Sequence, residues 1–210
     1  MRKLLSLIIL LSALSAGART AADFLLSAPY SGVPAIAERA RLEMLEYFKS
    51  GSEARVKNVF GGSSKVAVNT PEYVTVDVSD KTQITVAVVP ARRDTMIAVI
   101  ETVLTPVPDS RVTFYSTDWK ELAQQPGELT VADFVDRAAL KADPEAEMPE
   151  FPFYTLTYMP DDNTFMAANT TPKYYAKVDR PSGLRAMKPA IRVRFDGKKW
   201  KIIDKLEPNR

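Results

Sequence analysis

The spacing of apolar residues predicts a helix over residues 33–49. Its apolar stripe recurs every three or four positions and consists of Ile36, Ala37, Ala40, Met44, Tyr47 and Phe48. The charged residues fall largely on the opposite, solvent side: Glu38, Arg39, Arg41, Glu43 and Lys49. Ser31 or Gly32 is suited to cap the start, Pro34 is tolerated in the first turn, and Gly51 is suited to end the helix.

After Gly51 the period of the apolar residues changes from 3.6 to 2, which predicts strands. Between Tyr73 and Val78, for example, valines alternate with polar residues. The predicted strands of this half are 55–60, 65–69, 73–78, 82–89, 95–104 and 111–116. Residues 95–104 are the most continuously apolar, so this strand is expected to be central and buried on both faces.

A second helix is predicted over residues 130–142. Thr130 is suited to cap it, and Asp133 completes a capping box in which Asp replaces the usual Glu. Its expected buried face is Val131, Phe134, Val135 and Ala138. The strands predicted after it are 151–159, 164–169, 173–178, 189–195 and 198–203, with a loop over 180–188.

The last two strands are expected to form a hairpin around Asp196-Gly197. A two-residue turn pairs Arg194 with Lys199 and Arg192 with Lys201. The opposite face then carries apolar residues, namely Ile191, Val193, Trp200 and Ile202. Like charges that face each other cost about 0.2–1 kcal/mol per pair. Something acidic is therefore expected over the basic face, either the acidic residues of 133–162 or an anionic ligand. The alternative is that the long side chains simply reach into water.

This order of elements predicts an α+β fold with a mostly antiparallel β-sheet and two helices, near 33–49 and 130–142. The helix-then-sheet order occurs twice, which leaves open two similar halves that meet near residue 125. No residue pattern common to the two halves stands out, and no low-complexity linker separates them. A single α+β domain over 19–210 is therefore preferred.

The N-terminal segment is typical of a bacterial secretory signal peptide. Arg2 and Lys3 precede an apolar run over 4–14, and Ala16-Gly17-Ala18 provides a cleavage pattern. The run is about half of the roughly 20 residues that span a membrane. We therefore expect removal of residues 1–18 and a periplasmic or secreted mature protein without a transmembrane anchor.

The chain contains no histidine and no cysteine. It therefore lacks the usual general base near neutral pH, the thiol nucleophile, and the commonest ligands of zinc and iron–sulfur sites. A lipid anchor through cysteine is likewise excluded. No cofactor, metal site or catalytic residue is predicted, and the balance favours a protein that is not an enzyme.

The charge balance argues against nucleic acid as a partner. The chain carries 28 basic and 26 acidic side chains, and loss of Arg2 and Lys3 with the signal leaves the two numbers equal. A nucleic-acid-binding protein normally has a basic excess. The charges are nevertheless uneven, because residues 133–162 are mostly acidic and residues 173–205 mostly basic. These two stretches are expected to neutralise each other in the fold.

Two weaker sets of candidate residues remain. A carboxylate pair for glycoside hydrolysis would have to come from acids such as Glu101, Asp118, Asp161 and Asp162. Aromatic residues for a sugar- or peptide-binding face would come from Tyr154, Tyr158, Tyr174 and Tyr175, although strand aromatics more often serve packing.

Three segments together resemble a domain-of-unknown-function family of secreted proteins from the Bacteroides group. They are Phe60-Gly61-Gly62, Pro106-Val107-Pro108-Asp109-Ser110 and Phe114-Tyr115-Ser116-Thr117-Asp118-Trp119-Lys120, within a resemblance that covers roughly 23–122. The resemblance implies an exported envelope protein without a known activity. If that origin holds, Asp94-Thr95-Met96 is similar to a bacterial O-glycosylation pattern, which makes Thr95 a candidate acceptor.

The leading hypothesis from the sequence is an exported, non-catalytic binding or interaction protein of the bacterial envelope. Its partner would be an unidentified envelope protein or an anionic ligand, contacted by the basic hairpin face: Arg192, Arg194, Lys199 and Lys201. A carboxylate-dependent carbohydrate-active enzyme and a structural envelope component are the alternatives.

Overall fold

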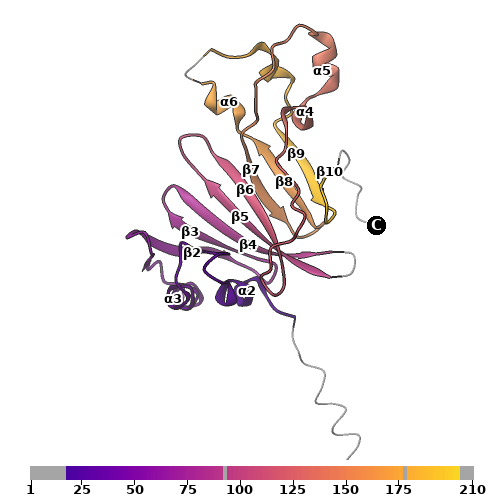
Figure 1. The fold of residues 1–210 in the computed structure, drawn as a ribbon. Coiled ribbons are helices and arrows are strands. Elements are labelled where there is room, and N and C mark those ends of the chain that lie inside the picture. Colours follow the sequence, from indigo (N-terminus) through magenta and orange to yellow (C-terminus); the bar gives the residue numbers. More distant parts are fainter. Residues whose placement is uncertain (1–17, 92–93, 177–178, 204–210) are drawn as a thin grey trace, which may run out of the picture.

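The computed structural model describes residues 18–91, 94–176 and 179–203, and Figure 1 shows two antiparallel sheets with short helices around them. The helices are α2 (Ala21–Ser27), α3 (Glu38–Lys49), α4 (Val131–Phe134), α5 (Arg137–Ala142) and α6 (Thr171–Tyr174), with a 3-10 turn, η1 (Ser182–Ala186). None of the helices in these ranges is both long and apolar enough to cross a bilayer. The predicted signal peptide, up to Gly17, lies outside the described residues.

The first sheet is a six-stranded meander in which every strand pairs with its neighbour in sequence. Its strands are β1 (Val56–Lys57), β2 (Ser63–Asn69), β3 (Tyr73–Ser79), β4 (Thr82–Pro90), β5 (Thr95–Val103) and β6 (Asp109–Ser116). The mostly antiparallel α+β fold expected from the sequence is therefore confirmed. β1 is shorter than predicted because the Asn58 side chain closes a turn, its Oδ1 accepting from the N–H groups of Phe60 and Gly62.

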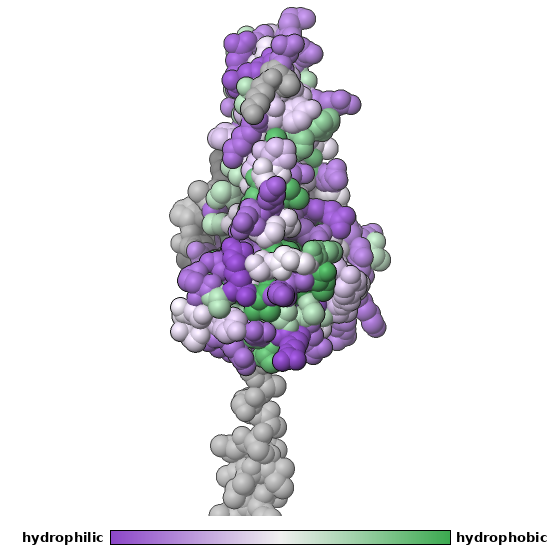
Figure 2. Space-filling model, turned by 90° about the vertical axis from the view of Figure 1, so that its left-hand side faces the viewer, coloured by the Kyte–Doolittle hydropathy of each residue, from purple (hydrophilic) through white to green (hydrophobic). Residues whose placement is uncertain are grey.

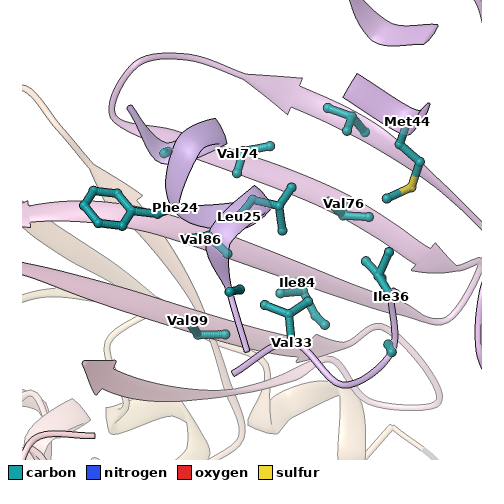
Figure 3. Close-up of a cluster of buried hydrophobic side chains, with 14 of the residues drawn as sticks. Phe24, Leu25, Val33, Ile36, Met44, Val74, Val76, Ile84, Val86 and Val99 are labelled. Carbon is teal, nitrogen blue, oxygen red and sulfur yellow. The ribbon is translucent and has the colours of Figure 1, made fainter. Parts of the chain in front are cut away.

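The alternation of side chains gives this sheet two buried faces. One face of β3, β4 and β5 packs against α2 and α3, with residues such as Val76, Val86 and Val99 in the core (Figure 3). The other face, including Ala98 and Phe114, packs against the second sheet. β5 lies between β4 and β6 and is buried on both faces over most of its length, as its apolar run predicts.

The second sheet has the order β10-β9-β8-β7 and is also antiparallel. Its strands are β7 (Tyr154–Met159), β8 (Thr164–Asn169), β9 (Ala190–Phe195) and β10 (Trp200–Ile202). β7 lies beside the start of β6, where the Leu156 amide donates to Ser110 Oγ at 3.0 Å (Figure 1). An aromatic cluster fills the space between the sheets, with the Phe114 and Phe195 ring centroids 4.3 Å apart.

α2 was not expected from the sequence. Thr20 caps it through a capping box: the Thr20 amide donates to Asp23 Oδ2 at 2.8 Å, and the Asp23 amide donates to Thr20 Oγ1 at 3.3 Å. Phe24 and Leu25 then enter the first core (Figure 3). The same capping box starts α4, as predicted, where the Thr130 amide donates to Asp133 Oδ2 at 2.7 Å.

The two capping boxes belong to a shared pattern, so the expectation that the halves have no residues in common was wrong. Thr-x-Ala-Asp-Phe occurs at residues 20–24 and again at 130–134. Phe24 is buried in the core of the first sheet and Phe134 in the core of the second. This pattern supports two similar halves, while the preference for a single domain over 19–210 stays a prediction.

The predicted helix over 33–49 differs from the structure at its start and on one face. α3 begins at Glu38, and the segment before it forms turns that carry Val33 and Ile36 into the core. Arg41, expected on the solvent side, is only 2% exposed. Its guanidinium donates to backbone carbonyls instead of facing water. The helix ends as predicted, before Gly51 with its φ of 71°.

Two predictions in the second half were also wrong. The helix over 130–142 is interrupted at Val135, which forms a β-bridge with Met187, so Ala138 lies exposed on the separate helix α5. The strand over 173–178 is not formed in its described part, because residues 171–174 form α6 with a proline in its first turn.

Exposed large apolar side chains gather in the first half of the chain. Of the nine in the described part of the chain, five lie between residues 30 and 60: Tyr30, Leu42, Phe48, Val59 and Phe60. Figure 2 shows a mostly polar face whose hydrophobic residues lie mainly in its lower, broader part. Such residues are the kind of surface through which a structural envelope component would self-associate.

Candidate functional site

The basic hairpin face forms with a register two residues away from the predicted one. Phe195 pairs with Trp200 and Arg194 with Lys201, so residues 196–199 form a four-residue connection. Asp196 Oδ1 accepts from the amides of Lys198 and Lys199, both at 3.0 Å, which stabilises this longer turn. A shift by two residues keeps the paired residues on their predicted faces, while Lys199 moves from the strand into the connection. It leaves one directly opposed cation pair in place of two, and Ile202 is 37% exposed instead of buried.

Acidic and carbonyl groups lie against most of this face. Arg192 forms an ion pair with Asp162 Oδ2, and Arg194 Nη2 donates to the Asp162 carbonyl at 2.9 Å. Lys201 Nζ lies 3.1 Å from Asp196 Oδ2. The pKa of Asp196 is lowered to about 2, mainly by the hydrogen bond from the Lys199 backbone amide. Lys201 and the Lys198 amide also contribute. The acidic 133–162 stretch thus supplies one neutralising group, Asp162. Contact of this face with a ligand stays a prediction.

A cleft of about 710 Å³ lies between β6, the segment 125–129 and the segment 151–154. We call it the β6 cleft. Three carboxylates line it, Asp109, Glu121 and Glu128, together with the rings of Phe151 and Phe153. Sequence reasoning did not find this site, because its walls come from three separate parts of the chain.

Asp109 connects the two sheets at the inner end of the β6 cleft. Its Oδ1 accepts from the Tyr154 amide at 3.2 Å, where β7 begins. Partial burial raises the pKa of Asp109 above its ordinary value near 3.8, and the charge of Glu128 adds to the rise. Hydrogen bonds from the Tyr154 and Ser110 amides act in the opposite direction but do not cancel the rise.

We expect Asp109→Asn to fold normally and Asp109→Ala to lose about 1–3 kcal/mol of unfolding free energy, since alanine leaves both amides without an acceptor. The raised pKa means that the folded chain holds the Asp109 proton more tightly than the unfolded chain. The stability of the wild type should therefore fall as pH rises from 3.8 through the raised pKa, relative to that of Asp109→Asn. Urea unfolding across this pH range measures the difference, and equal pH slopes for the two proteins would contradict it.

Tyrosines at the cleft stay protonated over the ordinary pH range. Burial raises the pKa of Tyr115, with the charges of Glu121 and Glu101 adding to it. Burial also raises the pKa of Tyr154, whose hydroxyl oxygen accepts from the Leu129 amide at 3.2 Å. These hydroxyls are therefore suited to hydrogen bonding and to holding the walls of the cleft.

The structure separates the four tyrosines considered as a binding face. Tyr154 and Tyr158 are buried in the second core, and burial raises the pKa of Tyr158 to about 12. Tyr174 is 43% exposed and packs on Phe153 with ring centroids 5.1 Å apart. Tyr175 packs edge-on against Tyr174. Two of the four thus lie in an aromatic group that adjoins the β6 cleft through Phe153.

Two of the acids considered for catalysis are held in ion pairs on different sheets. Glu101 on β5 lies 3.2 Å from Arg111 Nη2, and Asp162 pairs with Arg192. Within the described ranges, no three acidic residues are grouped closely enough to hold a metal ion.

A protein-family model matches most of the chain. The model of DUF3256, described as a protein of unknown function, matches residues 13–200. The chain belongs to the DUF3256 family. The match extends the resemblance seen over 23–122 to almost the whole sequence, and the description of DUF3256 gives no activity. Comparison with curated proteins finds no match.

A solved structure has the same fold as this DUF3256 chain. It is described as the structure of a domain of an uncharacterized protein from Porphyromonas gingivalis W83. The two share 18% identity with a TM-score of 0.66, over 88% of this chain and 98% of the other.

Thr95 is the first residue of β5 in this DUF3256 fold, beside the turn that follows β4. Its amide donates to Asp94 Oδ1 at 2.8 Å, and its side chain is partly exposed. O-glycosylation of Thr95 stays a prediction.

Proposed function

We propose that this protein is an exported binding protein of the bacterial cell envelope and that the β6 cleft holds its ligand. The observation that carries the proposal is the cleft itself: about 710 Å³, lined by charged and polar side chains beside the rings of Phe151 and Phe153. Ligand sites in proteins commonly have this size. Export is supported by the signal-like residues 1–18.

The β6 cleft is a better primary site than the basic hairpin. Arg192 and Lys201 already have carboxylate partners, so an anionic ligand would have to compete with Asp162 and Asp196. The carboxylates of Glu121 and Glu128 are exposed in the cleft. The hairpin, through Arg194 and Lys199, serves as the second contact surface.

An NMR titration of residues 19–210 tests the site. The panel consists of short peptides, neutral and acidic oligosaccharides, peptidoglycan fragments and anionic lipids. We expect at least one compound to shift the Leu129 and Tyr154 amides and to raise the melting temperature, since saturation at 100 times Kd stabilises by about 2.7 kcal/mol. Glu46→Gln, on the solvent side of α3, should bind equally well. Shifts confined to β9 and β10, or no shift with any compound, would overturn the proposal.

Fractionation of the native host tests export. The protein should be recovered from the periplasm or the medium with Arg19 as its first residue. Recovery from the cytoplasm with residues 1–18 attached would overturn this part of the proposal.

A carboxylate-dependent carbohydrate-active enzyme is the second candidate. It is favoured by the raised pKa of Asp109 in a cleft that also contains Glu128, because glycosidases pair a protonated acid with an ionised one. Under this function, Asp109→Asn and Glu128→Gln would abolish hydrolysis of an oligosaccharide while binding persists. Absence of turnover across the oligosaccharide panel would dismiss it.

A further inference from the structure

The outer edge of β6 is covered over only part of its length. β5 and β6 pair without any shift from Met96–Ser116 to Val103–Asp109, so the backbone groups of alternate residues point away from β5. Ser116 and Phe114 belong to this outward set. The Ser116 amide donates to the Lys120 carbonyl at 2.8 Å, and the Leu122 amide donates to the Phe114 carbonyl at 2.9 Å. The segment 120–122 therefore acts as a short neighbouring strand.

Gln125 continues this cover with its side chain. Its Oε1 accepts from the Phe114 amide and its Nε2 donates to the Phe114 carbonyl, both at 2.9 Å. This is the pair of bonds that a residue on an adjacent strand makes. The chain then leaves β6, because Pro126 has no N–H and Gly127 has a φ of 73°. Trp200 Nε1 donates to the Gly127 carbonyl at 3.1 Å, and this hydrogen bond keeps Gly127 away from β6.

Val112 is the next outward residue of β6, and it lines the β6 cleft. Within the described part of the chain, its outward N–H and C=O have no hydrogen-bond partner. An edge strand with free backbone groups is a template for an added strand. The cleft therefore offers main-chain hydrogen bonds beside the place that Gln125 occupies.

The side chains around this edge determine what can bind. Arg111 is the one basic residue among the cleft-lining residues described, and it is paired with Glu101 at 3.2 Å. Three lining carboxylates, Asp109, Glu121 and Glu128, are not balanced by it. Phe151, 45% exposed, adds an aromatic ring that can contact a cation.

We propose that the β6 cleft binds an extended peptide segment of a partner protein that carries a Lys or Arg side chain. The main chain of the peptide adds to β6 at Val112, and the carboxylates that line the cleft attract its cationic side chain. Main-chain bonds supply affinity and side-chain charge supplies specificity, as in other cases of strand addition. This inference rests on the proposed binding function of the cleft and names the class of its ligand.

The probe is the blocked peptide acetyl-Thr-Val-Lys-Val-Thr-amide, titrated into labelled residues 19–210. We expect shifts of the Val112 and Tyr154 amides and slower hydrogen exchange at Val112. Replacing Lys by Glu, or N-methylating alternate peptide amides on the bonding side, should each weaken binding by about tenfold or more. The first change removes the charge and the second the main-chain bonds.

Protein variants supply the matched comparison. Glu121 and Glu128 are both exposed, so Glu121→Gln with Glu128→Gln should fold and bind the Lys peptide about tenfold more weakly. Glu46→Gln, on the solvent side of α3, should bind like the wild type.

No shift at Val112 with about 1 mM Lys peptide overturns the inference, since weaker binding would be too poor for recognition. Equal binding of the N-methylated peptide overturns strand addition as well. If an oligosaccharide shifts the cleft amides while no peptide does, the inference fails but the proposed binding function stands. If no compound shifts the cleft, both fail.

Discussion

Replacing Arg41 by Met is expected to lower the free energy of unfolding by about 3–5 kcal/mol. The Arg41 guanidinium donates to four backbone carbonyls, those of Leu25, Ala28, Val33 and Ile36. Burial lowers the pKa of Arg41, and no carboxylate is among its described hydrogen-bond partners. Methionine would remove all four arginine bonds, and the Leu25 carbonyl would keep only the Ala28 amide as a donor. Each buried carbonyl left without a donor costs about 1–3 kcal/mol when it is not relieved by water.

Arg39 provides the matched control because it lies on the same helix and is exposed. Arg39→Met should change stability by no more than about 0.5 kcal/mol. The stability of Arg41→Lys should fall between that of the wild type and that of Arg41→Met. The lysine ammonium donates three hydrogen bonds but lacks the planar fork of the guanidinium. Urea unfolding followed by circular dichroism measures all three, and the Met variant should melt roughly 6–20 °C lower. An Arg41→Met midpoint equal to that of Arg39→Met would show that the four bonds contribute nothing.

The role of Arg41 shows where helical spacing is insufficient. The spacing placed Arg41 among the charged residues of the solvent side, a good rule for an isolated amphipathic helix. The rule failed because α2 and the turns before α3 cover that side and present backbone carbonyls to the guanidinium. Such cover depends on tertiary contacts, which the local pattern does not contain.

The missed helix α2 was within reach of the sequence. Thr20-Ala21-Ala22-Asp23 is the same kind of capping box that identified the start of α4 at Thr130. β3 and β4 were predicted well because one-sided burial imposes alternation on much of their length, and β5 because burial on both faces imposes a continuous apolar run.

The β6 cleft could not be predicted in the same way. Its walls join β6 to the segments 125–129 and 151–154, which have no regular period. The basic hairpin was visible because the alternation along two adjacent strands assigns each side chain to a face, even though the register differed by two residues. The sequence therefore favoured the basic hairpin, which is formed by neighbouring strands. The β6 cleft depends on how the second sheet packs on β6.

Phe114 lies where the two sheets meet, and Phe114→Ala is expected to cost about 3–5 kcal/mol. Its side chain is fully buried, and its ring centroid lies 5.8 Å from that of Phe165 and 4.3 Å from that of Phe195. Alanine would leave a cavity that these rings can fill only in part. Phe60→Ala is the control, because Phe60 is 72% exposed and should change stability little.

Hydrogen exchange of the Phe114→Ala variant also tests how the two sheets depend on each other. The lost contacts belong to the second core, whereas β3 is held by α2 and α3 in the first. We therefore expect protection to fall more in β8 and β9 than in β3, because regions with separate cores open separately. An equal loss in β3 and β8 would show that the sheets unfold as one unit. The shared Thr-x-Ala-Asp-Phe pattern would then mark two similar halves that have become a single cooperative domain.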